Sequence, residues 1–289
     1  MKTIIITGAN SGIGKQCAMQ LSSLGHRVIM ACRNQVRGEK ARDEIIASTG
    51  NKETFLKVVD LSEMASVRTF VSEIQKEYPI IDVLINNAAD FDIARKKRQL
   101  TIEGLESQFA TNVVAPFLLS IALLSNLEKS QHGKIINISS QGLVLYPFLS
   151  LNLNNLNGEK KYNAATQYYQ NKLALLMLSL YIKNNVKLKT KIHAIRVTNV
   201  KVDISRYPNL SNFQRRLYMM KSKFSISAAD MAKAYVLLAL DDNFDGFYVD
   251  ENLKEVKVNK GAHDREKQIC LIKYLMEITG LSNEFISFK

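Results

Sequence analysis

The chain has 289 residues, 46% of them hydrophobic, which is enough to build the core of one large α/β domain. Its formal net charge of +12 comes from basic residues that alternate with apolar ones, as on solvated faces, and no nucleic-acid-binding motif accompanies them, so we expect no nucleic-acid partner. The longest apolar run, Leu173 to Ile182, is about half of the ~20 residues that a bilayer crossing needs, and Met1 to Ile6 lacks the order of a signal peptide, which predicts a cytoplasmic protein without an integral membrane segment.

Short β-branched runs alternate with longer helical stretches along the whole chain. This alternation predicts an α/β fold: a single-domain Rossmann fold over residues 1–289, with a doubly wound parallel sheet and helices on both faces. We expect a cofactor half at about residues 1–140 and the catalytic helix and substrate segments at about 141–289. The expected strands are 4–6, 28–30, 55–59, 83–85, 135–138, 192–197 and 247–249, and the expected helices are 12–24, 63–78, 102–127, 162–183, 228–240 and 265–279.

A glycine-rich turn joins the first strand to the first helix. At this junction, backbone N–H groups and the positive end of the helix dipole face outward, where they suit the pyrophosphate of a dinucleotide. A tight turn without a ligand would use glycines too, but the place of this turn in a doubly wound sheet favours cofactor binding. The candidate residues are Gly8, Asn10, Ser11, Gly12, Ile13 and Gly14.

The end of the second strand decides which nicotinamide cofactor is bound. A carboxylate there would accept hydrogen bonds from the ribose 2′-hydroxyl of NAD(H), whereas a base would pair with the 2′-phosphate of NADP(H). The residues are Ala31-Cys32-Arg33-Asn34, with no carboxylate. The planar guanidinium of Arg33 suits a phosphate, so the sequence favours NADP(H). Arg33 would be a plain surface cation only if the glycine turn bound nothing.

Tyr168 and Lys172 are four residues apart in a predicted helix, so their side chains share one face. A phenol with an ordinary pKa of ~10 needs a nearby positive charge to act as an acid and base near neutral pH, and a lysine can supply it. Ser140 follows the fifth strand at the sheet edge where open α/β sheets bind ligands. Tyr169 is out of this register and is interpreted as packing.

Metal chemistry and disulfides are not expected. The three cysteines are far apart and odd in number, and the four histidines lack ligand spacing. We interpret both sets as ordinary packed or surface side chains.

Several motifs resemble the short-chain dehydrogenase/reductase family over roughly Lys2 to Leu281. The glycine spacing at 8, 12 and 14 is one, Asp60-Leu61 resembles the Asp that contacts adenine, and Asn86-Asn87-Ala88-Ala89 resembles the Asn-Asn-Ala-Gly motif of the cofactor channel. The resemblance implies Asn87 and Ala88 beside the cofactor.

The same resemblance implies roles for the catalytic residues. Ser140 would hold the substrate oxygen and Tyr168 would donate or remove the proton. Lys172 would grip the nicotinamide ribose, and Asn112 would hold a water in a proton relay to Lys172. Family members form homodimers or homotetramers through helices that correspond to about Ala110 to Leu124 and Ala165 to Tyr181, so such an assembly is possible here.

Further sequence segments resemble the retinol-dehydrogenase-like branch of the family, whose members act on apolar aldehydes, ketones and alcohols. A small-molecule carbonyl or alcohol substrate is therefore implied. The matching segments are Ala31 to Asn34, the long polar loop between Ser140 and Tyr168, Lys172 to Ala174, Asp245 to Tyr248 and Ile278 to Leu281.

One motif departs from the family. Val197-Thr198 stand where Pro-Gly usually wraps the nicotinamide carboxamide, and Val202 stands where a Thr is usual. Two hypotheses follow: an active NADP(H)-dependent oxidoreductase in which backbone groups near Val200 hold the carboxamide, or an NADP(H)-binding protein with weak or no catalysis that acts through a protein partner. The basic, apolar segment Phe213 to Met220 is expected to be a substrate lid, with loose membrane contact as the alternative.

Overall fold

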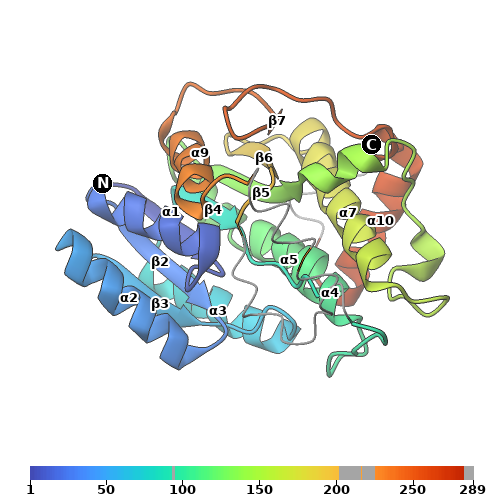
Figure 1. Cartoon of the computed structure of the whole chain (residues 1–289), viewed down its shortest axis with the longest axis horizontal. Helices are drawn as coiled ribbons and strands as arrows, with labels where there is room; N and C mark the ends of the chain where they lie inside the picture. The colour runs from blue at the N-terminus through green and yellow to red at the C-terminus, as the bar shows by residue number, and fades with distance from the viewer. Residues whose placement is uncertain (93–94, 202–215, 217–224, 283–289) are drawn as a thin grey trace.

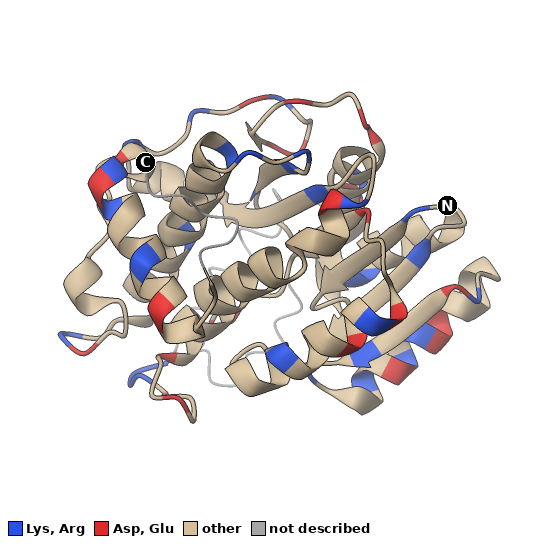
Figure 2. Cartoon of the chain, turned by 180° about the vertical axis from the view of Figure 1, so that it is seen from behind, with Lys and Arg blue, Asp and Glu red and all other residues tan. Residues whose placement is uncertain are grey.

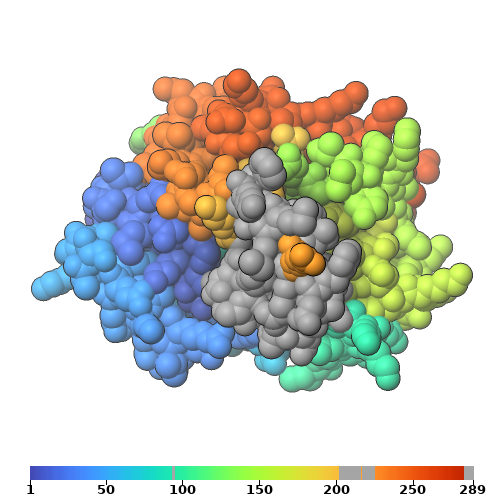
Figure 3. All heavy atoms as spheres, in the orientation of Figure 1, coloured from blue at the N-terminus to red at the C-terminus, as the bar shows by residue number. Residues whose placement is uncertain are grey.

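The structure is a computed structural model that describes residues 1–92, 95–201, 216 and 225–282 (Figure 1). Within these residues, seven parallel strands form one sheet in the order β3-β2-β1-β4-β5-β6-β7. In Figure 3 the N-terminal βα units (blue) lie at the left, residues 141–185 (green to yellow) lie at the right, and residues 225–282 (orange to red) lie along the top. The strands are β1 (Thr3–Thr7), β2 (Arg27–Cys32), β3 (Thr54–Val58), β4 (Val83–Asn86), β5 (Lys134–Ser140), β6 (Lys191–Val197) and β7 (Tyr248–Val249).

The central strands are runs of buried β-branched residues, as expected for a parallel sheet covered on both faces. Two separate apolar cores confirm this covering: α1, α2 and α9 pack on one face, and α3, α5, α7 and α10 belong to the core of the other. The predicted doubly wound Rossmann fold is therefore confirmed. The long helices are α1 (Gly12–Ser23), α2 (Gln35–Thr49), α3 (Met64–Glu77), α5 (Ala115–Ala122), α7 (Ala164–Asn185), α9 (Ala228–Leu240) and α10 (Arg265–Thr279).

The sequence did not reveal α2. Its first turn is capped by the Asn34 side chain, which accepts a hydrogen bond from the Arg37 N–H, and it ends at Gly50 in the left-handed region, with φ of 70°. Gly38, Ala41 and Ile45 are its buried residues. Because most of the other residues of this helix are polar, its apolar periodicity is too weak to stand out.

The helix expected over 102–127 starts later and is broken. The Glu106 side chain caps the short helix α4 (Ser107–Phe109), which continues through the π-helical turn η1 (Ala110–Val114) into α5, and α6 (Leu124–Glu128) follows. Residues before Glu106 form turns instead of helix. The π-helical turn lies where Asn112 was expected to act, and such turns are frequent at functional sites.

The inserted loop between β5 and α7 contains the short 3-10 turns η2 (Gln141–Leu145) and η3 (Leu153–Asn155), and η5 (Lys260–His263) precedes α10. Every residue of α7 from Asn171 to Ile182 is buried. Part of this cover comes from α10, whose Leu271, Ile272 and Leu275 belong to the same apolar core as the α7 residues. The helices expected to form subunit contacts are thus already largely covered within one chain.

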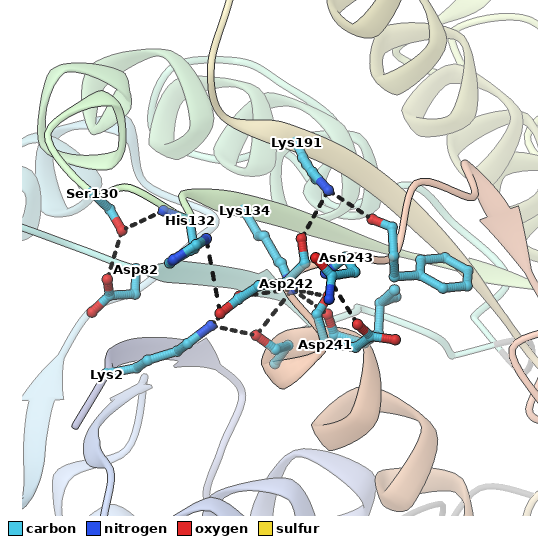
Figure 4. A network of polar contacts seen from close by, with 12 residues as sticks. Lys2, Asp82, Ser130, His132, Lys134, Lys191, Asp241, Asp242 and Asn243 are labelled. Carbon is cyan, nitrogen blue, oxygen red and sulfur yellow. Dashed lines mark hydrogen bonds and ion pairs between the residues drawn. The ribbon is translucent and has the colours of Figure 1, made fainter.

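The ends of three strands meet the last turn of α9 at the amino edge of the sheet (Figure 4). Lys134 of β5 is buried and donates hydrogen bonds to the carbonyl oxygens of Leu238, Ala239 and Asp241, at 3.0, 3.3 and 2.7 Å. Lys2 pairs with the Asp242 carboxylate. These cations satisfy carbonyl groups that a helix C-terminus leaves without partners.

Acidic and basic residues alternate on the surface helices, most visibly on α2 at the lower right of Figure 2. This pattern matches the interpretation of the positive charge as solvated faces. Among the described residues, no helix combines the length and the apolar character needed to span a bilayer. Val202 and the segment Phe213 to Met220, apart from Arg216, lie outside the described residues.

Candidate active site

The turn between β1 and α1 has a shape that only glycine allows. Gly8 and Gly12 have φ of 66° and 58°. A Cβ on Gly8 would lie 3.0 Å from the Cα of Ala88, and one on Gly14 would lie 2.6 Å from the carbonyl oxygen of Gly8. The backbone of the turn is therefore packed directly against the end of β4.

Hydrogen bonds hold the two segments together. The Asn87 amide donates to the carbonyl oxygen of Thr7 at 2.8 Å, and the Ala88 N–H donates to the Thr7 hydroxyl at 2.9 Å. Asn87 and Ala88 thus lie beside the glycine turn, and their contact with a cofactor stays a prediction. The first Asn of this motif, Asn86, is buried and bonds Asn137 of β5 at 2.8 Å, so it supports the sheet.

The first turn of α1 keeps its N–H groups available. Ser11 precedes the helix in an extended conformation, and its side chain makes no capping hydrogen bond. By contrast, the first turns of α2, α7, α9 and α10 are each capped by a side chain, from Asn34, Asn163, Ser227 and Asp264. Uncapped N–H groups next to a cradle that a Cβ would fill suit a phosphate, so these residues fit a dinucleotide.

Arg33 extends from the end of β2 over the same edge. Its side chain is 75% exposed, and its Nε lies 4.0 Å from the Asp60 carboxylate. Asp60 is fixed by the N–H and the hydroxyl of Ser62, at 2.9 and 2.6 Å. Leu61 is buried, so only its backbone can face a ligand. An exposed cation and an anchored carboxylate therefore lie next to each other at the carboxyl ends of β2 and β3.

Cys32 supports the glycine turn from below, a role that the sequence gave no reason to expect. Its buried sulfur lies close to the backbone N–H groups of Ala9 and Asn10. Burial raises the pKa of this thiol to about 11, although these N–H groups act to lower it. The side chain is thus a neutral thiol packed against the turn.

Lys172 is the most deeply buried cation near the candidate chemistry. Its Nζ donates a hydrogen bond to the carbonyl oxygen of Ile138 at 2.7 Å and lies 5.6 Å from the centre of the Tyr168 ring. Burial lowers the pKa of Lys172 to about 8. The i, i+4 spacing therefore places an ammonium group next to the phenol.

Ser140 and Ser139 differ in their surroundings. Ser139 is buried and lies 3.3 Å from the Tyr248 hydroxyl, on the far side of the strand end. Ser140 is half-buried, and its hydroxyl accepts a hydrogen bond from the Gly142 N–H at 3.2 Å. The second serine of the pair is thus the one nearer the open edge.

The side chain of Asn112 is bonded to the backbone of Asp90. Its amide oxygen accepts a hydrogen bond from the Asp90 N–H at 2.8 Å, and its amide nitrogen donates to the Asp90 carbonyl oxygen at 2.9 Å. This pair of bonds ties η1 to the segment that follows β4. The water that Asn112 is expected to hold toward Lys172 stays a prediction.

The adjacent tyrosines Tyr168 and Tyr169 each pack against another aromatic ring. The Phe91 ring lies 4.3 Å from the Tyr168 ring at an angle of 52°. Tyr169 packs on Tyr146 at 4.7 Å, and a Cβ on Gly142 would lie only 2.3 Å from its ring. The packing role expected for Tyr169 agrees with this geometry.

The segment that replaces the Pro-Gly turn is paired with residues before α9. The Ile226 N–H donates to the carbonyl oxygen of Asn199, and the Lys201 N–H donates to that of Ile226, both at 3.0 Å. Val200 therefore lies between two bonded residues, and its own N–H and C=O point away from Ile226. Thr198 donates to the Gln141 side chain at 2.9 Å. These bonds fix the segment without a proline.

Comparisons with known proteins agree with this geometry. The family model described as "short chain dehydrogenase" matches residues 2–210. The chain belongs to the short-chain dehydrogenase family. Mouse retinol dehydrogenase 13 is 32% identical over 289 residues, covering 97% of this chain and 84% of its own, and mouse retinol dehydrogenase 14 is 32% identical over 257 residues, covering 85% and 75%. The resemblance to the retinol-dehydrogenase-like branch is thereby confirmed.

Solved structures share the fold. A putative uncharacterized protein from Mycobacterium paratuberculosis superposes with a TM-score of 0.73 at 25% identity, covering 98% of this chain and 94% of its own. A short-chain dehydrogenase from Shigella flexneri, described as complexed with NADP, has a TM-score of 0.66 at 21% identity, covering 87% and 97%. The chain is thus an oxidoreductase of a family that acts on alcohol and carbonyl groups with a nicotinamide cofactor.

Proposed function

We propose that this protein is an NADP(H)-dependent oxidoreductase. It transfers a hydride between the nicotinamide and the carbonyl or alcohol group of an apolar small molecule, with Tyr168 as general acid and base. The observation that carries the proposal is the position of the Lys172 ammonium, held by Ile138 and lying 5.6 Å from the Tyr168 ring. A buried cation this close to a phenol stabilises the phenolate that proton transfer requires.

The cofactor would lie across the carboxyl edge of the sheet. Its pyrophosphate would meet the uncapped first turn of α1, its adenine would lie near Asp60 and Leu61, and its carboxamide would meet the outward-facing backbone groups of Val200. The exposed Arg33 guanidinium supports NADP(H) over NAD(H), because it can form charge-assisted hydrogen bonds with the 2′-phosphate. The residues of the turn are Gly8, Asn10, Ser11, Gly12, Ile13 and Gly14.

The chemistry would use three side chains. When bound, the reduced nicotinamide supplies the hydride. Ser140 would donate a hydrogen bond to the substrate oxygen, which gains negative charge as a carbonyl is reduced. Tyr168 would deliver the proton to this oxygen, and in the reverse direction would remove it. Lys172 would stabilise the phenolate and hold the ribose hydroxyls, while Asn112 would hold a water in a proton relay to Lys172.

A binding protein with weak or no catalysis is the second candidate. Val197 and Thr198 occupy the place of the usual Pro-Gly turn, and a loosely held nicotinamide would slow transfer, since a misplacement of ~1 Å can cost ~100-fold in rate. The bonds of Ile226 with Asn199 and Lys201 favour the enzyme, because they hold this segment in place. Cytoplasmic location and a homodimer or homotetramer stay predictions.

Two measurements separate the candidates. NADPH fluorescence tests cofactor binding, and we expect a change that saturates on adding the folded protein. A panel of apolar aldehydes, ketones and alcohols, monitored at the nicotinamide absorbance, tests turnover. Binding with turnover that Tyr168→Phe abolishes supports the enzyme. Binding without any turnover favours the partner-acting protein, and no binding refutes both.

A further inference from the structure

Asp90 lies directly after the cofactor-channel motif and is bonded through all of its polar groups. Its backbone N–H and C=O pair with the Asn112 side chain at 2.8 and 2.9 Å. Its carboxylate accepts hydrogen bonds from Nη1 and Nη2 of Arg95, at 2.9 and 3.0 Å, and from the Ser107 hydroxyl at 2.8 Å. Such a bidentate ion pair fixes the orientation of the two side chains as well as the distance between them.

The ion pair is largely withdrawn from solvent. The side chains of Arg95 and Asp90 are 13% and 20% exposed. Arg95 also lies 3.9 Å from the Glu106 carboxylate, which is fully buried, caps α4 and accepts a hydrogen bond from the Tyr162 hydroxyl at 3.1 Å. The segment after β4 is therefore anchored both to α4 and to the loop that leads into α7.

The residue next to Asp90 touches the candidate acid and base. The Phe91 ring packs on the Tyr168 ring at 4.3 Å, on a helix that starts more than seventy residues later in the chain. Because a phenol ring turns about its side-chain bonds, a neighbouring ring limits where its hydroxyl can lie. Residues 90 and 91 thus reach η1 on one side and Tyr168 on the other.

We propose that Asp90, Arg95 and Phe91 are positioning residues for Tyr168: the Asp90–Arg95 ion pair holds Phe91 against the Tyr168 ring, and this contact keeps the hydroxyl where proton transfer needs it. The inference rests on the proposed function for its catalytic consequence. The positioning itself is a property of the protein without substrate, so it can be measured separately.

The first test observes Tyr168 directly. NMR spectra of protein labelled with [13C]tyrosine, with the Tyr168 signal assigned by Tyr168→Phe, would be compared among variants. Phe91→Leu removes the ring, and we expect the Tyr168 ring signals to shift because they lose its ring current. Asp90→Asn and Arg95→Lys keep Phe91 but weaken the ion pair. The asparagine amide carries no charge, and a lysine ammonium cannot form the bidentate hydrogen bonds of a guanidinium. We expect both to shift the same signals in the same direction.

Arg98→Gln is the matched control. Arg98 lies in the same segment and pairs with Glu159 at 3.8 Å, but both side chains are more exposed, at 35% and 49%. We expect no shift of the Tyr168 signals. If Asp90→Asn and Arg95→Lys leave these signals at their wild-type positions, or Arg98→Gln moves them equally, the positioning role is refuted. Should Asp90→Asn fail to fold, Arg95→Lys and Phe91→Leu decide the outcome.

The second test measures turnover on a substrate found by the panel. We expect Phe91→Leu and Asp90→Asn to lower kcat by ~10–100-fold, the scale of an ångström-sized misplacement, with KM and the Kd for NADPH changed by less than about twofold. A purely structural role would lower the amount of folded protein and leave kcat per folded molecule unchanged. Absence of turnover in the wild type would refute the proposed enzyme, whereas the Tyr168 signals would still decide the positioning.

Discussion

The Nζ of Lys172 lies 2.7 Å from the carbonyl oxygen of Ile138, and this hydrogen bond holds a buried ammonium group beside β5. Burial lowers the pKa of Lys172 to about 8 from an ordinary 10.5. The folded state therefore holds this charge at a cost. In the proposed enzyme, this loss of stability is the consequence of keeping an ammonium group beside Tyr168, where catalysis needs it.

The first prediction follows from the sign of this shift. Between about pH 8 and the ordinary pKa of a lysine, the unfolded chain binds more protons than the folded one, so the Lys172 contribution makes the protein more stable as the pH rises through this window. Lys172→Met removes the buried charge and should raise the free energy of unfolding at pH 7.5, by up to roughly 3 kcal/mol for a shift of this size, while abolishing turnover. Urea unfolding at pH 7.5, 9 and 10 measures the stability and its dependence on pH, and a turnover assay measures the loss of activity.

Lys134 provides the internal comparison, because burial also lowers its pKa to about 8. It is unchanged in Lys172→Met, so the variant should keep part of the rise in stability with pH and lose the part that belongs to Lys172. Identical pH dependence in the variant and the wild type would contradict the prediction.

The second prediction concerns the two adjacent tyrosines. Tyr168→Phe should lower kcat by ~10³-fold, within the usual range for loss of a general acid and base, and leave NADPH binding nearly unchanged. Tyr169→Phe is the matched control, since Tyr169 packs on Tyr146 and is out of register with Lys172. Steady-state kinetics on one substrate compare them. Equal losses in the two variants would remove Tyr168 from its proposed role.

The parts of the site that could be predicted are those set by local spacing. The glycines at 8, 12 and 14 and the pair Tyr168 and Lys172 are separated by a turn or a helical repeat, so their relation is visible in the sequence. Phe91 and Tyr168 are brought together only by tertiary packing, and no local pattern announces their contact. The proximity of Cys32 to the glycine turn likewise has no local pattern, because the turn follows β1 and Cys32 ends the neighbouring strand β2.

The fold shows the same division. The buried strands could be predicted because continuous β-branched runs mark a covered parallel sheet. The helix α2 could not be predicted, since its buried face consists of only three residues, Gly38, Ala41 and Ile45. The start of the helix before Asn112 was placed too early, because the Glu106 cap that begins it does not resemble the usual Ser, Thr, Asp or Asn.

The third prediction tests cofactor selectivity. Arg33→Ala should raise the Kd for NADPH by ~10–100-fold, which corresponds to the loss of a charge-assisted contact, and leave the Kd for NADH nearly unchanged. Arg37→Ala is the control, because Arg37 is an exposed cation in the first turn of α2. Fluorescence titration with both cofactors gives the four constants. Equal weakening of NADPH and NADH by Arg33→Ala would disprove the selectivity argument.

The fourth prediction concerns acid stability at the opposite edge of the sheet, where Asp242 meets three basic side chains (Figure 4). Burial raises the pKa of the Asp242 carboxyl. The hydrogen bond from Lys2 and the charges of Lys2, Lys134 and His132 outweigh this effect and bring the pKa below its usual value. A lowered pKa in the folded state means that this carboxylate stabilises the protein above the ordinary pKa of an aspartate, and that the stabilisation is lost as the pH falls through the folded value.

Asp242→Asn should therefore lower the free energy of unfolding at pH 7 and reduce its fall between about pH 5 and pH 3. Asp245→Asn is the control: its side chain is 82% exposed and pairs with Lys191, so its effect should be smaller. Urea unfolding over this pH range measures both variants. NADPH binding should stay at the wild-type value in each, because the cluster lies at the amino edge of the sheet and the glycine turn at the carboxyl edge. A loss of cofactor affinity as large as the loss of stability would show that the two edges are coupled and would contradict this separation.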